Sequence, residues 1–101
     1  MAAHPDSDPR FVELKPDEAK RLAREIVENG TVQFCGHSKE EMEKDDLQST
    51  DIQNMLRGGV YEAPETVSGE LRYRVETQRM AVVFTFKSID RLRVITAWRK
   101  R

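Results

Sequence analysis

The stretch "LRYRVETQRMAVVFTFKSIDRLRVITAWR", residues 71–99, decides the fold because its apolar side chains follow the periods of strands. In residues 71–77, apolar and charged side chains alternate, as they do in a strand with one buried and one exposed face. Residues 80–86 are apolar on both faces, which is typical of a central strand. Residues 92–99 form a third apolar run. The stretch therefore predicts three consecutive antiparallel strands.

The residues that precede this stretch predict one long helix and two further short strands. A helix is expected to begin near Pro16 and to stop at Gly30, because apolar residues recur between them at helical spacing. Residues 31–35 alternate and predict a brief strand. Residues 60–63 predict another strand, and residues 67–70 predict a tight turn into the C-terminal strands.

Two short helices are expected between these strands. Ser38 is followed three residues later by Glu41, which is the spacing of a capping box, and this pattern predicts a helix over residues 39–46. The same spacing recurs from Thr50 and predicts a third helix over residues 51–57.

The order of these elements predicts an α+β fold. We expect two to three N-terminal helices packed on a curved, mainly antiparallel sheet of four to five strands. Residues 1–12 contain two prolines and little to bury, so they are expected to be a flexible tail. Residues 13–101 are expected to form a single domain.

Composition excludes several classes of protein. The chain has no apolar run near the ~20 residues that would span a bilayer, and no signal-peptide pattern opens it. A single cysteine, Cys35, and two histidines cannot supply a tetrahedral metal site. The sequence therefore predicts a cytoplasmic protein with no metal, no cofactor and no membrane contact.

Charge is unevenly distributed along the chain, although the formal net charge is only −1. Residues 1–50 carry 7 Lys and Arg against 12 Asp and Glu, whereas residues 51–101 carry 10 against 6. Residues 71–101 alone carry 9 against 2. Such a basic region can attract phosphates or an acidic partner, or it can simply be a solvated sheet face.

His37 has two interpretations. It precedes the expected helix cap at Ser38, so its ring can pack over the first helical turn near Met42. Alternatively, the positive end of the helix dipole keeps the imidazole neutral near pH 7, where it can accept or relay a proton.

The basic and aromatic residues of the C-terminal strands also have two interpretations each. Arg72 and Arg74 share one strand face, where they are either solvated or a pair of cations for a phosphodiester. Simple alternation places Trp98 on the same face as Leu92 and Val94, which favours a core position over a base-stacking one.

The order of several segments resembles a family of small bacterial RelE/ParE-like toxins. The segments are VQFCGHSKEEMEKDD, DIQNMLRGGVYE, RYRVETQRMAVVFTF and LRVITAWR, and together they cover residues 31–99 approximately. The positions that match the family pattern are His37, Met42, Leu56, Gly59, Val60, Arg72, Val94, Ile95, Thr96 and Trp98.

This resemblance implies a RelE-like fold and the toxin half of a toxin–antitoxin pair, acting as a metal-independent mRNA endoribonuclease. The implied partners are a cognate antitoxin and mRNA, free or bound to the ribosome. His37 would then accept or donate the proton, while cations stabilise the charge on the phosphoryl oxygens. The other site residues would be Arg72 as phosphate clamp, Arg74 or Arg79 as second cation, Thr96 to orient the phosphate, Trp98 to stack a base, and Arg99, Lys100 and Arg101 as further RNA contacts.

The chain departs from the common form of that family. An arginine often follows the methionine in the family, but here residues 43–46 are Glu, Lys, Asp and Asp, and the isoelectric point is near 6.1. The alternative function is therefore a binding module without catalysis, which docks a protein or a nucleic acid on a basic sheet face.

Overall fold

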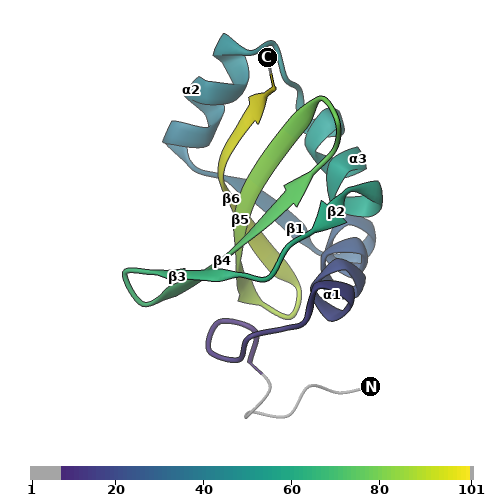
Figure 1. The fold of residues 1–101 in the computed structure, drawn as a ribbon, viewed down its shortest axis with the longest axis vertical. Coiled ribbons are helices and arrows are strands. Elements are labelled where there is room, and N and C mark those ends of the chain that lie inside the picture. The colour runs from purple at the N-terminus through teal and green to yellow at the C-terminus, as the bar shows by residue number, and fades with distance from the viewer. Residues whose placement is uncertain (1–7, 101) are drawn as a thin grey trace.

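The C-terminal half of the chain forms a sheet that packs against helices from the N-terminal half (Figure 1). The computed structural model describes residues 8–100. The helices in this range are α1 (Pro16–Asn29), α2 (Gly36–Lys44) and α3 (Ser49–Gly58). The strands are β1 (Thr31–Phe34), β2 (Val60–Tyr61), β3 (Glu65–Val67), β4 (Glu70–Glu76), β5 (Met80–Ser88) and β6 (Arg91–Arg99). The predicted α+β fold is confirmed.

The described strands form one sheet in the order β1-β6-β5-β4-β2, and β3 pairs with β4 beside this path. Among residues 8–100, only β1 and β6 pair in parallel, and the other strand pairs are antiparallel. The range 8–100 thus contains six strands, whereas four to five were predicted. The strand without a sequence signal is β3, because it has only three residues, two of them exposed, and follows Pro64 directly.

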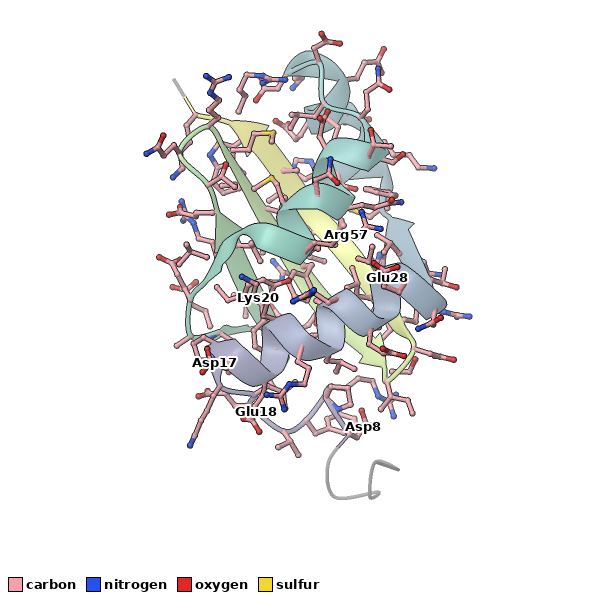
Figure 2. The ribbon with its side chains drawn as sticks, turned by 90° about the vertical axis from the view of Figure 1, so that its right-hand side faces the viewer. Asp8, Asp17, Glu18, Lys20, Glu28 and Arg57 are labelled. Carbon is pink, nitrogen blue, oxygen red and sulfur yellow. The ribbon has the colours of Figure 1, made fainter. Side chains whose placement is uncertain are left out.

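The core lies between one face of the sheet and the helices α1 and α3, which Figure 2 shows in front of the strands. Helix α1 buries Ala19, Ala23 and Ile26, which recur at helical spacing. On the sheet, the ring of Tyr73 stacks on Phe84 with centroids 5.6 Å apart and meets the edge of another aromatic ring. Full burial of each such ring stabilises the fold by about 1.5–3 kcal/mol.

A β-bulge between β5 and β6 changes which residues of β6 face the core. Val83 pairs with Thr96, but the next residue of β5, Phe84, pairs with Val94, so Ile95 is the extra residue. After the bulge, Ala97 is fully buried. The prediction that Trp98 shares a face with Leu92 and Val94 is therefore wrong, because the extra residue shifts the alternation by one.

The helix starts also differ from the prediction. Helix α2 begins at Gly36, and its N-cap is Cys35, whose sulfur accepts a hydrogen bond from the Ser38 backbone N–H at 3.4 Å. Ser38 lies inside the helix, where its buried hydroxyl donates to the Cys35 carbonyl at 2.8 Å. A serine hydroxyl can make this local bond within a helix as readily as it caps one, so the predicted capping box at Ser38 is wrong.

Helix α3 likewise starts before the predicted cap. Its N-cap is Gln48, and the Gln48 backbone N–H donates to the Asp51 carboxylate at 2.8 Å. Thr50 is an exposed residue of the first turn and is not the cap. The capping interaction therefore comes from the acidic residue of the first turn, which also interacts favourably with the helix dipole.

Residues 8–12, which the sequence assigns to the flexible tail, form a hydrogen-bonded turn. The N–H groups of Phe11 and Val12 both donate to the Asp8 carbonyl at 3.0 Å, and Pro9 is buried. Residues 1–7 of the predicted tail lie outside the described range. Within residues 8–100, no helix is both long and apolar enough to cross a membrane.

The start of α3 can be tested by two neighbouring substitutions. We expect Asp51→Ala to lower the free energy of unfolding by about 1 kcal/mol, because it removes the acceptor for the Gln48 N–H and a charge that favours the helix N-terminus. Thr50→Ala is the matched control and should leave the urea midpoint nearly unchanged. Equal shifts for the two variants would contradict this assignment of the cap.

Candidate functional site

The face of the sheet opposite α1 and α3, here called the open face, carries several of the predicted site residues. Val75, Val82 and Ala97 are paired across β4, β5 and β6 and point into the core. The adjacent set of pairs therefore points the other way, because side chains alternate along a strand. It consists of Arg74, Val83 and Thr96.

A cavity of about 320 Å³ opens on this face. Residues 62–67, which include β3, form one side, and strands β4, β5 and β6 supply the floor. Its lining residues are Glu62, Ala63, Glu65, Val67, Arg72, Arg74, Val83, Ile95 and Thr96. The structure therefore brings together three of the predicted site residues, Arg72 and Arg74 from β4 and Thr96 from β6.

Arg72 is held by a glutamate on its own strand. Its Nε donates to the Glu70 carboxylate at 3.0 Å, and Lys87 pairs with the second oxygen of the same carboxylate at 3.4 Å. Burial raises the pKa of Glu70, but the hydrogen bonds from Arg72 and Lys87 outweigh this effect and leave the pKa lowered. Glu70 is therefore a stable anion that positions two cations on the open face.

Arg74 is held by both an anion and an aromatic ring. Its Nη2 lies 2.7 Å from the Glu76 carboxylate, and a weaker ion pair joins it to Glu62 at 3.8 Å. The Arg74 guanidinium also lies 5.0 Å from the centre of the Trp98 ring. This contact requires Trp98 on the open face, where the bulge in β6 places it.

The cavity is close to electrically neutral, in contrast to the basic surface that the sequence suggests. Two arginines and two glutamates, Glu62 and Glu65, line it. The glutamates precede the basic stretch 71–101, so a charge count over that stretch misses them. The turn predicted at residues 67–70 is the sequence feature that could have placed Glu65 in the cavity. A hairpin that closes at this turn puts Glu65 opposite Arg72.

His37 lies away from this cavity. It is an exposed residue in the first turn of α2 and does not line the cavity. Within residues 8–100, its side chain has no hydrogen bond or ion pair. The structure therefore does not combine His37 with the arginines, and its catalytic role stays a prediction.

Of the remaining predicted site residues, those that the structure describes lie around the end of the sheet. Arg79 is exposed in the β4–β5 turn, and Lys100 pairs with Glu76 at 3.4 Å. Arg99 secures the C-terminal end of α2: its Nε donates to the Asp45 carbonyl and its Nη2 donates to the carbonyl of the next residue, both at 3.2 Å. Arg99 therefore has a structural role. Arg101 lies outside the described residues.

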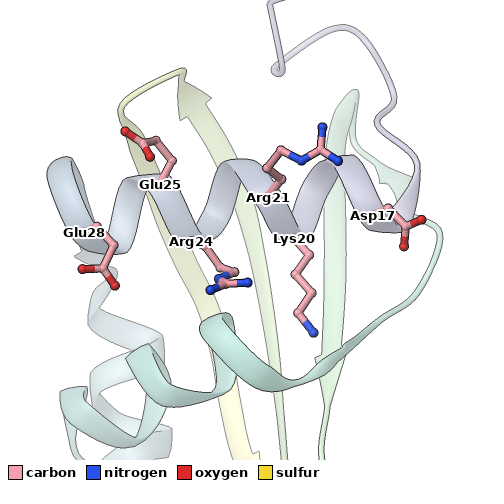
Figure 3. A pocket seen from close by; sticks show the side chains of 6 residues that line it. All are labelled: Asp17, Lys20, Arg21, Arg24, Glu25 and Glu28. Atoms are coloured by element: carbon pink, nitrogen blue, oxygen red, sulfur yellow. The ribbon is translucent and has the colours of Figure 1, made fainter.

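Two other features of the described range do not form a comparable site. Burial raises the pKa of the Cys35 thiol, but hydrogen bonds from Ser38 and the charge of Arg93 outweigh it and lower the pKa overall. A cavity of about 510 Å³ is lined by charged side chains of α1 (Figure 3). Lys20 and Arg24 project to one side of the helix there, so this hollow is a solvated helix face.

Residues 8–100 contain no cluster of His, Cys, Asp and Glu that could hold a metal ion.

Comparison of the chain with protein-family models, with curated proteins and with solved structures finds no match. The likeness to RelE/ParE-like toxins therefore rests on the sequence pattern alone.

The pairing of Arg74 with Glu76 predicts a measurable pKa change. The lowered pKa of Glu76 arises because the hydrogen bond and charge of Arg74, with the charge of Lys100, outweigh the effect of burial. The pair therefore stabilises the fold above the ordinary glutamate pKa of 4.5, and this contribution is lost as the pH falls through the lowered pKa. We expect Arg74→Gln to raise the pKa of Glu76 towards 4.5, as measured by NMR titration. Arg79→Gln, in the nearby turn, is the control, and an equal effect of both variants would contradict the pairing.

Proposed function

We propose that the chain binds single-stranded RNA on the open face of its sheet, in the cytoplasm, as the toxin of a bacterial toxin–antitoxin pair. One observation supports the RNA-binding part most directly. Arg72, Arg74 and Thr96 line the same cavity, and Trp98 stands beside it in contact with one of the arginines. Fixed cations beside an aromatic ring are the usual means by which proteins hold a single strand.

The arginines keep donors for a phosphate although each is paired with a glutamate. Arg72 uses only its Nε on Glu70, which leaves the N–H groups of both terminal nitrogens for a ligand. The glutamate contact fixes the plane of the guanidinium, so little further side-chain entropy is lost on binding. Thr96 can donate its hydroxyl to a phosphate oxygen in the same cavity.

Trp98 supports contact with a base. It is half-buried, and the Arg74 guanidinium orients its ring. A base that stacks on an aromatic side chain stabilises the complex by about 1–3 kcal/mol without regard to sequence. A single strand that follows the open face could therefore place a phosphate at the arginines and the neighbouring base at Trp98.

The salt dependence of RNA binding tests the phosphate contacts. If Arg72 and Arg74 hold two phosphates, the logarithm of the binding constant should fall with the logarithm of salt concentration with a slope of about −1.4. The double variant Arg72→Gln/Arg74→Gln should flatten this slope, measured by fluorescence anisotropy with a poly-uridine oligonucleotide. The control Arg21→Gln/Arg24→Gln makes the same charge change on α1 and should leave the slope as it is.

Two results would contradict this function. Binding that does not depend on salt would show that the arginines do not hold phosphates. Equal losses in the sheet variant and the α1 variant would show that only the overall charge of the chain matters.

A second candidate function, metal-independent RNA cleavage, is favoured by the two carboxylates in the same cavity. Glu62 and Glu65 line it together with the arginines, so a proton acceptor and cations share one space. A carboxylate could accept the proton of a ribose 2′-hydroxyl as that oxygen attacks the adjacent phosphorus. Arg72 would stabilise the charge that develops on the phosphoryl oxygens, and water would return a proton to the leaving 5′-oxygen.

The competing proton acceptors can be separated by conservative substitutions. If a cavity carboxylate is the base, Glu62→Gln or Glu65→Gln should lower the rate of RNA cleavage by roughly 10²–10⁴-fold, because removal of a general base has that effect. His37→Gln should then leave the rate unchanged. If the imidazole predicted from sequence is the base, the pattern is reversed. Each variant should also be induced in a bacterial host, where relief of growth arrest would link the same residue to toxicity.

Failure of all three variants to change the rate would exclude both acceptors. If Arg72→Gln also left the cleavage rate unchanged, the cleavage would come from a contaminating nuclease. The RNA-binding function would then stand without catalysis.

A further inference from the structure

Strand β1 is one edge of the sheet formed by the described strands, and half of its backbone groups are directed away from its partner strand β6. The N–H of Thr31 donates to the Asp90 carbonyl at 2.9 Å, and the N–H of Cys35 donates to the Val94 carbonyl at 3.4 Å. Because alternate residues of a strand direct their backbone groups to opposite sides, those of Val32 and Phe34 face outwards. In the described range, β1 pairs with β6 and with no second strand.

Two cations lie beside this edge. Lys39, from the second turn of α2, and Arg93, from β6, line a cavity of about 460 Å³ together with Gln33 and Phe34 of β1. Both cations are exposed, and no ion pair of the described residues includes either of them.

This arrangement contrasts with the β4 side of the sheet. Arg72, Arg74, Lys87 and Lys100 each pair with a glutamate. Among residues 8–100, the β1 edge therefore combines outward backbone groups with cations that have no ion pair.

We propose that β1 receives an extended, acidic segment of a partner protein as an additional strand of the sheet. The backbone of that segment would bond to the outward groups of Val32 and Phe34. Its acidic side chains, at alternate positions, would meet Lys39 and Arg93 on the open-face side. Its intervening apolar side chains would cover Val32 and Phe34, which are both half-buried on the other side.

Charge decides between this occupant and a second copy of the chain. A symmetric pair of β1 strands would bring the same two cations of each copy towards one another, and like charges placed close together oppose association. An acidic segment instead pairs both cations and completes the hydrogen bonds of the edge. RNA could neutralise the charges, but it cannot extend the ladder of backbone hydrogen bonds.

The probe for this edge is a short fluorescent peptide in which glutamate and valine alternate. Two control peptides of the same sequence carry backbone N-methyl groups, one on the glutamates and the other on the valines. In an added strand, only one of these two sets directs its N–H groups at β1. We expect the unmodified peptide and one methylated peptide to bind, and the other methylated peptide to fail. On binding, the amide hydrogens of Val32 and Phe34 should become protected from exchange.

Protein variants test the charge requirement. Lys39→Glu/Arg93→Glu should weaken peptide binding by at least about tenfold, because two attractive contacts become repulsive. Lys20→Glu/Arg24→Glu, on α1, reverses the same number of charges and should have little effect. An NMR spectrum of each variant shows whether it is folded. The methylated peptides test the same edge on the unsubstituted chain, so that test does not depend on the folding of a variant.

Four outcomes would overturn the proposal. These are no binding of the unmodified peptide, equal binding of both methylated peptides, protection confined to other strands, and a chain that dimerises by itself with Val32 and Phe34 protected. Protection of these two amides by poly-uridine but not by the peptide would assign the edge to nucleic acid instead. The inference does not depend on RNA binding in the cavity lined by Arg72 and Arg74, because the variants that test the β1 edge change different residues from those that test that cavity.

Discussion

The register shift at Ile95 is the constraint on which the open face depends. With an unbroken register, Trp98 would point into the core, and Ala97 would be exposed. The extra residue exchanges these roles, so a small side chain packs beneath the helices and a large aromatic one stands on the open face beside Arg74. It also brings the end of β6 to α2, where the Arg99 backbone N–H donates to the Asp45 carboxylate at 2.7 Å. A single inserted residue thus links the core, the cavity and the position of α2.

The second feature that shapes the open face is the pairing of its arginines with glutamates. Glutamates on β4 and on the segment before it lie within reach of the arginines, so the cations are oriented but partly neutralised. Any phosphate that enters the cavity must share donors with these carboxylates, which limits affinity and favours ligands that also offer a base to Trp98. The arrangement is consistent with a pI near 6.1 and differs from a binding surface that relies on net positive charge.

The two edges of the sheet differ in whether their cations pair with neighbouring carboxylates. At the β4 side, Lys and Arg are satisfied by neighbouring glutamates, and β2 and β3 are short strands that cover β4. At the β1 side, the edge is four residues long, and the two cations beside it have no ion pair within the part of the chain that the structure describes. Short, charged edges protect a sheet from uncontrolled pairing, and the same charges can select a partner of the opposite sign. The cavity and the β1 edge are therefore separate surfaces with separate chemical requirements.

The sequence by itself determined the α+β class, the long helix α1 and the strands β4, β5 and β6, because these depend on local periods of 3.6 and 2 that need no knowledge of distant residues. Only the structure decided the helix starts, since Cys35 and Gln48 are the N-caps and Ser38 and Thr50 lie inside the helices that they were expected to cap. It also decided that Arg72, Arg74 and Thr96 share a cavity with two glutamates and that His37 does not. Those outcomes depend on strand pairing and on one bulge, and a one-residue change of register moves every later side chain to the opposite face.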